Sequence, residues 1–371
     1  MTILLVIVLL QSFLMLWLFI CGNKASYEQE RIDKLESKEA DDIDVIITAH
    51  EEYSVIRQAV LSLEPLRVHS IILALDHPDN DLINQILQLS LSKPIIVEKN
   101  FGEPGKIHTQ KLGLLRSCTE YVLIMDADIK VSLLAEEFNH MFNCFIESNC
   151  DFFCPYSFGI YSDSNTWAKI SDCDRTMRQQ IVRAGRDYYR MSNLSGYFLL
   201  AKREKYLQVI DANYLQDDVV ATINLFKQNM QVRTYHHVVC GELERESFYK
   251  SLMQRVRWTA GNLLIYPKYI DIFHGIGIKR GVVFVLSSHL WYTSLYCDLL
   301  AYVLCFMYYP LIYALMFEIV IKTLILSQRK KGTSNFFYHM VYSLVWPLFA
   351  TISLFGVIPY LIFKLENESR R

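Results

Sequence analysis

Apolar residues are concentrated at the two ends of the chain. Ile3 to Ile20 is an 18-residue apolar run interrupted only by Gln11 and Ser12. As a helix, this run would be about 27 Å long, close to the roughly 30 Å thickness of the bilayer's hydrocarbon core. A cleaved signal peptide is the alternative, but that needs a basic start, and only two residues precede the run. We therefore predict an N-terminal membrane anchor over residues 1–23.

The C-terminal third has the same lipid-like character. Residues 281–327 are long enough for two membrane spans and hold only three charged side chains: Asp298, Glu318 and Lys322. A basic loop at residues 328–335 separates them from a further membrane segment at 336–363 and a tail at 364–371. The positive-inside rule places that loop, and with it the central domain, in the cytoplasm. For segment 336–363, a full span and a re-entrant path both remain open.

The pattern in the central part of the chain predicts a soluble α/β domain. Residues 24–43 carry mixed charges and are predicted as a linker. From 44 to 264, short runs rich in β-branched residues alternate with amphipathic stretches, which predicts a parallel sheet covered by helices. An interfacial segment at 265–280 follows. Ligands in such sheets bind at the carboxyl ends of the strands, so we expect the functional residues there.

Composition narrows the class of protein. The chain has 371 residues, of which 52% are hydrophobic and 20% charged, which excludes a disordered or disulfide-stapled chain. The net charge of −2 provides no basic field for nucleic acid. Nine scattered cysteines without a C-x-x-C pair indicate reduced thiols and a cytosolic main body.

Two pairs of acidic residues are candidates for a functional site. Asp126 and Asp128 follow an apolar strand, and in an extended strand their carboxylates would share a face and converge on one cation, Mg²⁺ or Mn²⁺. A solvated strand end is the alternative. Asp217 and Asp218 stand at the start of a predicted helix, residues 219–228, where simple capping is the alternative.

Gln254-Arg-Val-Arg-Trp258 places two guanidiniums and an indole on one short segment, which suits a diphosphate and a sugar. A basic, aromatic interfacial helix is the alternative reading. Taken in order, these motifs resemble the membrane-embedded family 2 glycosyltransferases with a D, D-x-D, D, Q-x-x-R-W signature, such as hyaluronan, chitin and cellulose synthases. The resemblance covers residues 44–264 and implies an α/β, GT-A (Rossmann-like) domain with flanking transmembrane helices.

The resemblance also implies roles for individual residues. Asp218 would be the catalytic base, with Asp217 as the alternative, and Asp128 would hold the metal together with Asp126. The residues implied in nucleotide-sugar binding are Glu52, Asp76, Lys106, Asp126 and Arg257. Those implied in acceptor binding are Ser195, Gly196, Gln254 and Trp258. The chain departs from the family pattern at Thr48, Glu51, Lys111 and Asn224.

The implied activity is inverting transfer of a sugar from a nucleotide sugar, a UDP-sugar, to a growing glycan, with Mg²⁺ or Mn²⁺ as cofactor. Transfer of one sugar to a lipid acceptor, of the ceramide or polyprenyl phosphate type, is an alternative. A catalytically inactive membrane scaffold is another. The expected localisation is a multi-pass membrane protein, in contact with lipids, with a cytoplasmic catalytic domain. Because three or four spans make a thin channel, export of a glycan would need a homo-oligomer or an export partner.

Overall fold

The computed structural model describes residues 1–32, 42–50, 53–89, 91–212, 214, 216–244, 247–328 and 336–362. These form two compact units. The sheet unit comprises Ser26–Ser157 and Arg190–Leu243, and the helical unit comprises Met1–Ala25, Phe158–Tyr189 and Glu244–Arg371. Glu52, most of the predicted basic loop and the C-terminal tail lie outside the described residues.

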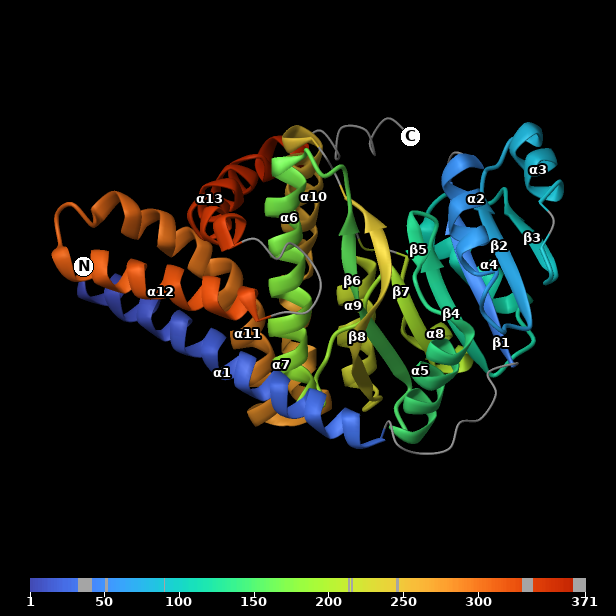
Figure 1. The fold of residues 1–371 in the computed structure, drawn as a ribbon, viewed down its shortest axis with the longest axis horizontal. Coiled ribbons are helices and arrows are strands. Elements are labelled where there is room, and N and C mark those ends of the chain that lie inside the picture. Colours follow the sequence, from blue (N-terminus) through green and yellow to red (C-terminus); the bar gives the residue numbers. More distant parts are fainter. Residues whose placement is uncertain are drawn as a thin grey trace. The chain divides into compact units, whose positions relative to one another are not determined.

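The sheet unit is built on a mixed sheet in the order β3-β2-β1-β4-β7-β6-β8-β5 (Figure 1). The strands are β1 Ile43–Ala49, β2 Ser70–Asp76, β3 Ile95–Asn100, β4 Tyr121–Asp126, β5 Ile129–Val131, β6 Phe152–Ile160, β7 Phe198–Lys202 and β8 Val232–Leu243. Strands β3, β2, β1 and β4 are parallel, as the sequence predicts, whereas β7 pairs antiparallel with both β4 and β6. Every residue of β1 and β2 is buried, which is typical of parallel strands covered on both faces.

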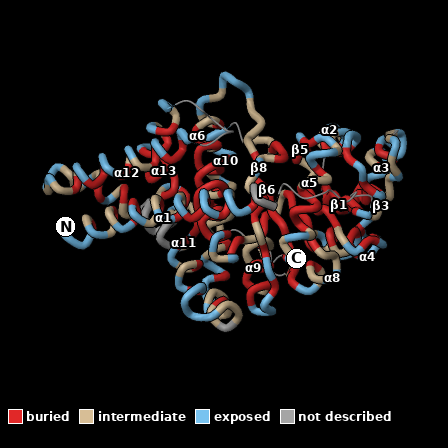
Figure 2. Tube along the Cα trace, turned by 60° about the horizontal axis from the view of Figure 1, so that its bottom comes forward, coloured by how far each residue is buried: buried red, intermediate tan, exposed pale blue. Residues whose placement is uncertain are grey.

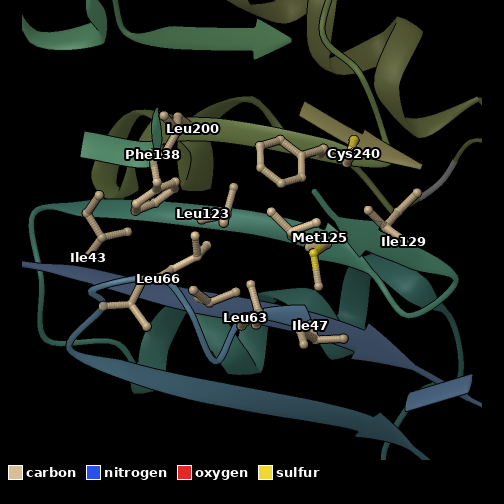
Figure 3. Packing of buried hydrophobic residues seen from close by; sticks show 14 of the residues in the cluster. Ile43, Ile47, Leu63, Leu66, Leu123, Met125, Ile129, Phe138, Leu200 and Cys240 are labelled. Atoms are coloured by element: carbon tan, nitrogen blue, oxygen red, sulfur yellow. The ribbon is translucent and has the colours of Figure 1, made fainter. Parts of the chain in front are cut away.

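Helices cover both faces of this sheet. They are α2 Tyr53–Ser62, α3 Asn80–Leu87, α4 Lys106–Arg116, α5 Ala135–Glu147, α8 Arg203–Val209 and α9 Asp217–Lys227. Ile47, Leu123 and Met125 point from the strands into one apolar core with Leu63 and Phe138 (Figure 3). In Figure 2, β1 is coloured as buried.

Helix α4 packs on the opposite face of the sheet. A side chain at its Gly113 would place a Cβ 2.7 Å from Ile46 Cγ2 and 3.3 Å from Ala74 Cβ. Glycine is therefore what allows α4 to lie this close to β1 and β2. This close packing sets the position of Lys106, the first residue of α4.

Asp44 ties together the amino ends of three elements. Its buried carboxylate accepts hydrogen bonds from Ser70 Oγ at 2.6 Å, Ser117 Oγ at 2.7 Å and the Cys118 N–H at 3.2 Å. His69 Nδ1 lies 2.8 Å from the same carboxylate. Burial alone would raise the pKa of Asp44, but these hydrogen bonds outweigh it and hold the pKa below the ordinary value.

The helical unit consists of long apolar helices together with helices that carry several charged residues. Its elements are α1 Thr2–Ile32, whose last turns belong to the sheet unit, α6 Thr166–Thr176, the π-helix η1 Met177–Arg183, α7 Ala184–Asp187, α10 Phe248–Ile265, the 3₁₀ turn η2 Tyr266–Tyr269, α11 Ile270–Leu304, α12 Tyr309–Ser327 and α13 Phe336–Phe355. Gly277, with φ +78°, kinks α11 in a conformation that favours glycine. Within the described residues, three helices are long and apolar enough to cross a membrane: Thr2–Gln29, Tyr309–Ser327 and Phe336–Ile362.

Candidate active site

Polar residues gather in the sheet unit where the parallel strands end. Strand β4 ends at Asp126 and β2 ends at Asp76, while α4 begins at Lys106. Open sheets of this kind bind ligands at the carboxyl ends of their parallel strands. The structure therefore brings several of the predicted site residues to the edge where a ligand is expected.

Lys106 is the cation among four acids, Asp126, Asp128, Asp217 and Asp218, and we call these residues the Lys106 cluster. Its Nζ lies 2.7 Å from Asp126 Oδ1 and 3.8 Å from Asp217 Oδ2, and it donates a 2.9 Å hydrogen bond to the carbonyl of Gly196. Burial would lower the pKa of Lys106, but the charges of Asp126 and Asp217 raise it above the ordinary value. The Lys106 side chain remains 34% exposed, so a ligand in solvent can still reach it.

The acids around Lys106 repel one another. Burial, together with the nearby charge of Asp128, raises the pKa of Asp126 to about 6, although Lys106 acts in the opposite direction. Carboxylates that share a site in this way favour an added positive charge. Since oxygen ligands suit Mg²⁺ and Mn²⁺, Asp126 and Asp128 have the chemistry of a divalent cation site.

The D-x-D segment differs from the predicted geometry. The sequence predicts both carboxylates on one face of an extended strand, but β4 ends at Asp126, and Ala127 and Asp128 form a turn. The turn arises because the next residues pair antiparallel with β8: Leu243 N–H donates to the carbonyl of Asp128, and β5 begins at Ile129. The two carboxylates are therefore brought together by a turn and not by the alternation of a strand.

Asp217 and Asp218 occupy the first turn of α9. Asp218 Oδ1 accepts a 2.8 Å hydrogen bond from the Val219 N–H. Burial and the charge of Asp217 raise the pKa of Asp218 to about 6, with Lys106 acting in the opposite direction. Helix capping, the predicted alternative, therefore does not account for the pair alone, because Asp217 and Asp218 also lie near the charge of Lys106.

The loop before β7 is fixed against the start of α9. The Leu194 N–H donates to Thr222 Oγ1 at 3.0 Å, and the Thr222 hydroxyl donates to the Asp218 carbonyl at 2.7 Å. A Cβ on Gly196 would lie 3.6 Å from both Asp218 Cβ and Lys106 Nζ, so this backbone lies directly beside both side chains. The Ser195 hydroxyl is buried and donates to the Phe198 carbonyl, which stabilises the loop itself.

Asp76 uses both carboxylate oxygens to order the loop that leads to Lys106. Oδ1 accepts from Asn100 Nδ2 at 3.0 Å, and Oδ2 accepts from the Gly105 N–H at 2.9 Å. Gly105 has φ +132°, a conformation that side chains rarely adopt. Asp76 thereby helps to position Lys106 at the start of α4.

The Q-x-x-R-W residues lie on α10 in the helical unit. There, Arg257 is exposed, whereas Trp258 packs against two guanidiniums: Arg178 Cζ is 5.2 Å and Arg255 Cζ 4.9 Å from its ring centroid. The buried Asp174 holds both arginines, accepting from Arg178 Nε at 2.7 Å and Arg255 Nη2 at 2.6 Å. Within this motif, Arg255 makes the buried ion pair, and Gln254 lies half-buried on the same helix.

A family model described as glycosyl transferase family group 2 matches residues 121–364. The chain belongs to this family. The probable glycosyltransferase YdaM of Bacillus subtilis (strain 168) is 21% identical over 363 residues, which cover 89% of this chain and 86% of YdaM. The mannosyltransferase PcManGT from Pyrobaculum calidifontis, solved in complex with GDP-Man and Mn²⁺, superposes with a TM-score of 0.53 at 12% identity, over 94% of this chain and 99% of that one. These likenesses confirm the predicted GT-A-like α/β fold.

Two residues with notable contacts, one in each unit, were not predicted from the sequence. The Tyr206 hydroxyl donates to Gln110 Oε1 at 3.0 Å, and burial together with the charge of Asp217 raises the pKa of Tyr206. Tyr206 is the fourth residue of α8, and nothing in its surrounding sequence distinguishes it from a core tyrosine. In the helical unit, the sequence does not single out Asp174 either, because its partner Arg255 is 81 positions away.

Proposed function

We propose that the protein transfers a sugar from a nucleotide sugar to an acceptor hydroxyl, with inversion of configuration at the anomeric carbon of the sugar. One observation carries the proposal. In a family 2 chain, Lys106, Asp126, Asp217 and Asp218 meet at the carboxyl edge of the parallel strands. This arrangement offers a cation for a diphosphate and carboxylates for a metal and for a proton.

Asp218 would act as the general base. Asp217 pairs with Lys106, whereas Asp218 Oδ1 accepts a hydrogen bond from the Val219 N–H of its own helix. A carboxylate with a pKa of about 6 is largely deprotonated at neutral pH and can accept the proton of an acceptor hydroxyl. Of the two acids, this favours Asp218 as the base and Asp217 as the partner of Lys106.

The donor side of the site would be formed by Lys106, Asp126 and Asp128. Lys106 Nζ lies within reach of ligands from solvent and would contact the diphosphate. Asp126 and Asp128 would hold Mg²⁺ or Mn²⁺, which when bound stabilises the negative charge of the leaving diphosphate. The Mn²⁺ and GDP-Man in the PcManGT complex support a nucleotide-sugar donor and a divalent cation, with UDP-sugars as the donor class favoured by the motifs.

For the acceptor we propose a growing glycan, with Ser195, Gly196, Gln254 and Trp258 in the acceptor region. Arg257 is proposed as a further cation for the diphosphate, and Glu52 and Asp76 as part of the nucleotide side. The three candidate membrane helices support an integral membrane protein. The basic loop at 328–335 supports a cytoplasmic catalytic domain.

The test uses full-length protein in lipid nanodiscs, supplied with radiolabelled UDP- and GDP-sugars and either Mn²⁺ or Mg²⁺. Nucleotide release and product size are measured for the wild type, for Asp218→Asn and for Asp81→Asn. Asp81 is a matched control, since it is an exposed acid in the first turn of α3. We expect turnover in the wild type and the control, and a loss of about 10²–10⁴-fold in Asp218→Asn.

The products decide between the acceptor classes. A high-mass, water-soluble product supports glycan extension, whereas a labelled product that partitions into organic solvent indicates a lipid acceptor. Equal turnover by wild type and Asp218→Asn would exclude Asp218 as the base. Absence of both turnover and nucleotide binding in the wild type would indicate an inactive scaffold.

A further inference from the structure

The helical unit contains a second charged centre, formed by one residue from α1, one from α11 and two from α12. These residues are Gln11, Asp298, Glu318 and Lys322, each 3% exposed or less. The Lys322 ammonium lies 3.1 Å from Asp298 Oδ2 and also pairs with Glu318 Oε1. Apolar side chains, among them Val8, Ala301 and Leu315, pack the same three helices together. We call this group the interhelical charge cluster.

The charges of the cluster do not balance. Asp298 and Glu318 contribute two carboxylates, Lys322 contributes one ammonium, and Gln11 is neutral. A net charge of −1 in an apolar interior is strongly unfavourable unless a further positive charge compensates it. Ionisable residues within a membrane-spanning bundle are therefore candidates for ion or proton sites.

Among the side chains that the structure describes, the other titratable groups of the packed helices do not supply that charge. Tyr302, one turn beyond Asp298 on α11, donates its hydroxyl to the Ser343 carbonyl of α13 at 3.0 Å. His339 of α13 hydrogen bonds Ser327, at the end of α12. Helix α1 has no charged side chain before Lys24. Among the described residues, Lys322 is thus the cation that the two carboxylates share.

The cluster also has unused acceptor atoms. The Gln11 amide points into it, since its Nε2 donates to Glu318 Oε1 at 2.7 Å and to Asp298 Oδ2 at 3.4 Å. Gln11 Oε1, Asp298 Oδ1 and Glu318 Oε2 are buried and have no hydrogen-bond partner within the described part of the chain. All three are oxygens, so what they need is a donor or a cation.

We propose that the interhelical charge cluster binds one monovalent cation, either a proton or an alkali metal ion, held by Asp298 and Glu318. This single charge neutralises the cluster and engages the unpartnered carboxylate oxygens of Asp298 and Glu318. An alkali ion would also accept Gln11 Oε1 as a ligand, whereas a proton would be shared by the two carboxyl groups. The site is separate from sugar transfer, because none of its residues belongs to the Lys106 cluster.

The experiment measures the thermal unfolding midpoint, Tm, of the full-length protein in nanodiscs. Sodium chloride is exchanged for N-methyl-D-glucamine chloride at constant ionic strength, at pH 6 and at pH 8. A bound alkali ion raises the Tm as sodium increases, by roughly 5 °C at a hundredfold excess over its Kd. A bound proton instead raises the Tm on going from pH 8 to pH 6 without sodium. Binding of ²²Na⁺ at one ion per chain is measured directly to distinguish the two sources.

Two variants with opposite expected effects test the charge argument. Glu318→Gln leaves one acid and one lysine, so the cation dependence of the Tm disappears. Lys322→Met leaves two acids without their ammonium, so the dependence becomes larger than in the wild type. Asp298→Asn repeats the first test in case Glu318→Gln does not fold. Glu136→Gln, at an exposed position of α5, is the control and keeps the wild-type response.

A purely structural cluster gives a different pattern. In that case both variants lower the Tm, and the response to sodium and pH is the same as in the wild type. A wild-type Tm that is insensitive to sodium, and that responds to pH only as Glu318→Gln does, would also overturn the proposal. Failure of the proposed sugar transfer is distinguishable, since it changes nucleotide release and not the cation dependence of the Tm.

Discussion

The pH dependence of turnover gives the sharpest test of the active-site geometry. A base must be deprotonated to act, and the pKa of Asp218 is raised to about 6 by burial and by Asp217. We therefore expect kcat/KM to fall below pH 6, reaching about a tenth of its plateau at pH 5. Asp217→Asn removes the second of the two causes, so the pKa of Asp218 falls and the acid limb moves down by about one pH unit.

The assay is nucleotide release under kcat/KM conditions between pH 4.5 and pH 8, for the wild type, Asp217→Asn, Asp218→Asn and the Asp81→Asn control. Asp218→Asn should lose about 10²–10⁴ in rate, equivalent to about 3–5.5 kcal/mol of barrier, and its residual rate should lack the limb near pH 6. The reasoning fails if Asp217→Asn is the variant that loses both the rate and the limb. In that case Asp217 is the base and the Lys106 contact has been misread.

Three further predictions concern stability and positioning, each measured by thermal unfolding in nanodiscs with nucleotide release as a second readout. Lys106→Met leaves the neighbouring carboxylates without their cation, so we expect the free energy of unfolding in EDTA to fall by about 1–3 kcal/mol, a range reduced because the lysine is one-third exposed. In Mn²⁺ the decrease should be smaller, and an equal decrease in both buffers contradicts this. Asp44→Ala leaves the buried hydroxyls of Ser70 and Ser117 without their acceptor and should lower the free energy of unfolding by about 2–4 kcal/mol. Because the folded pKa of Asp44 is lowered, its contribution is present at neutral pH and disappears as the pH falls below the ordinary carboxyl range, so wild type and variant should converge in acid. Gly113→Ala forces α4 away from Ile46, and we expect about 1–3 kcal/mol of destabilisation together with reduced turnover, whereas an unchanged Tm would show that the sheet yields easily.

The parallel half of the sheet was predictable because its strands are short, buried and rich in β-branched residues. Strands β1, β2 and β4 each form a nearly continuous apolar run, and a helix follows both β1 and β2. The antiparallel half was not, since an apolar run such as β7 carries no information about strand direction. The turn at Asp128 was missed for the same reason: it depends on pairing with β8, more than a hundred positions later.

In the candidate site, too, the sequence predicts some features and not others. The order of motifs identifies Lys106, Asp126, Asp217 and Asp218 as candidates, and the structure brings these four side chains together. What the sequence does not show is how Asp76 acts, because its contacts to Asn100 and Gly105 form only when β2 pairs with β3 and the loop before α4 folds back onto them. The same holds for Arg255, which the motif passes over and which Asp174 engages from another helix.

The charge balance of the Lys106 cluster links its two proposed ligands. Lys106 pairs with Asp126 and Asp217. Burial, together with the charges of Asp128 and Asp217, raises the pKa values of Asp126 and Asp218 to about 6, so further negative charge is unfavourable here. A nucleotide diphosphate adds further negative charge and would meet repulsion from the acids unless a divalent cation is bound as well. Binding of the metal and of the diphosphate should therefore strengthen each other by the same factor, because coupling between two sites is reciprocal. On this argument, Lys106 lies where it can exchange a carboxylate partner for a phosphate once the carboxylates engage the metal.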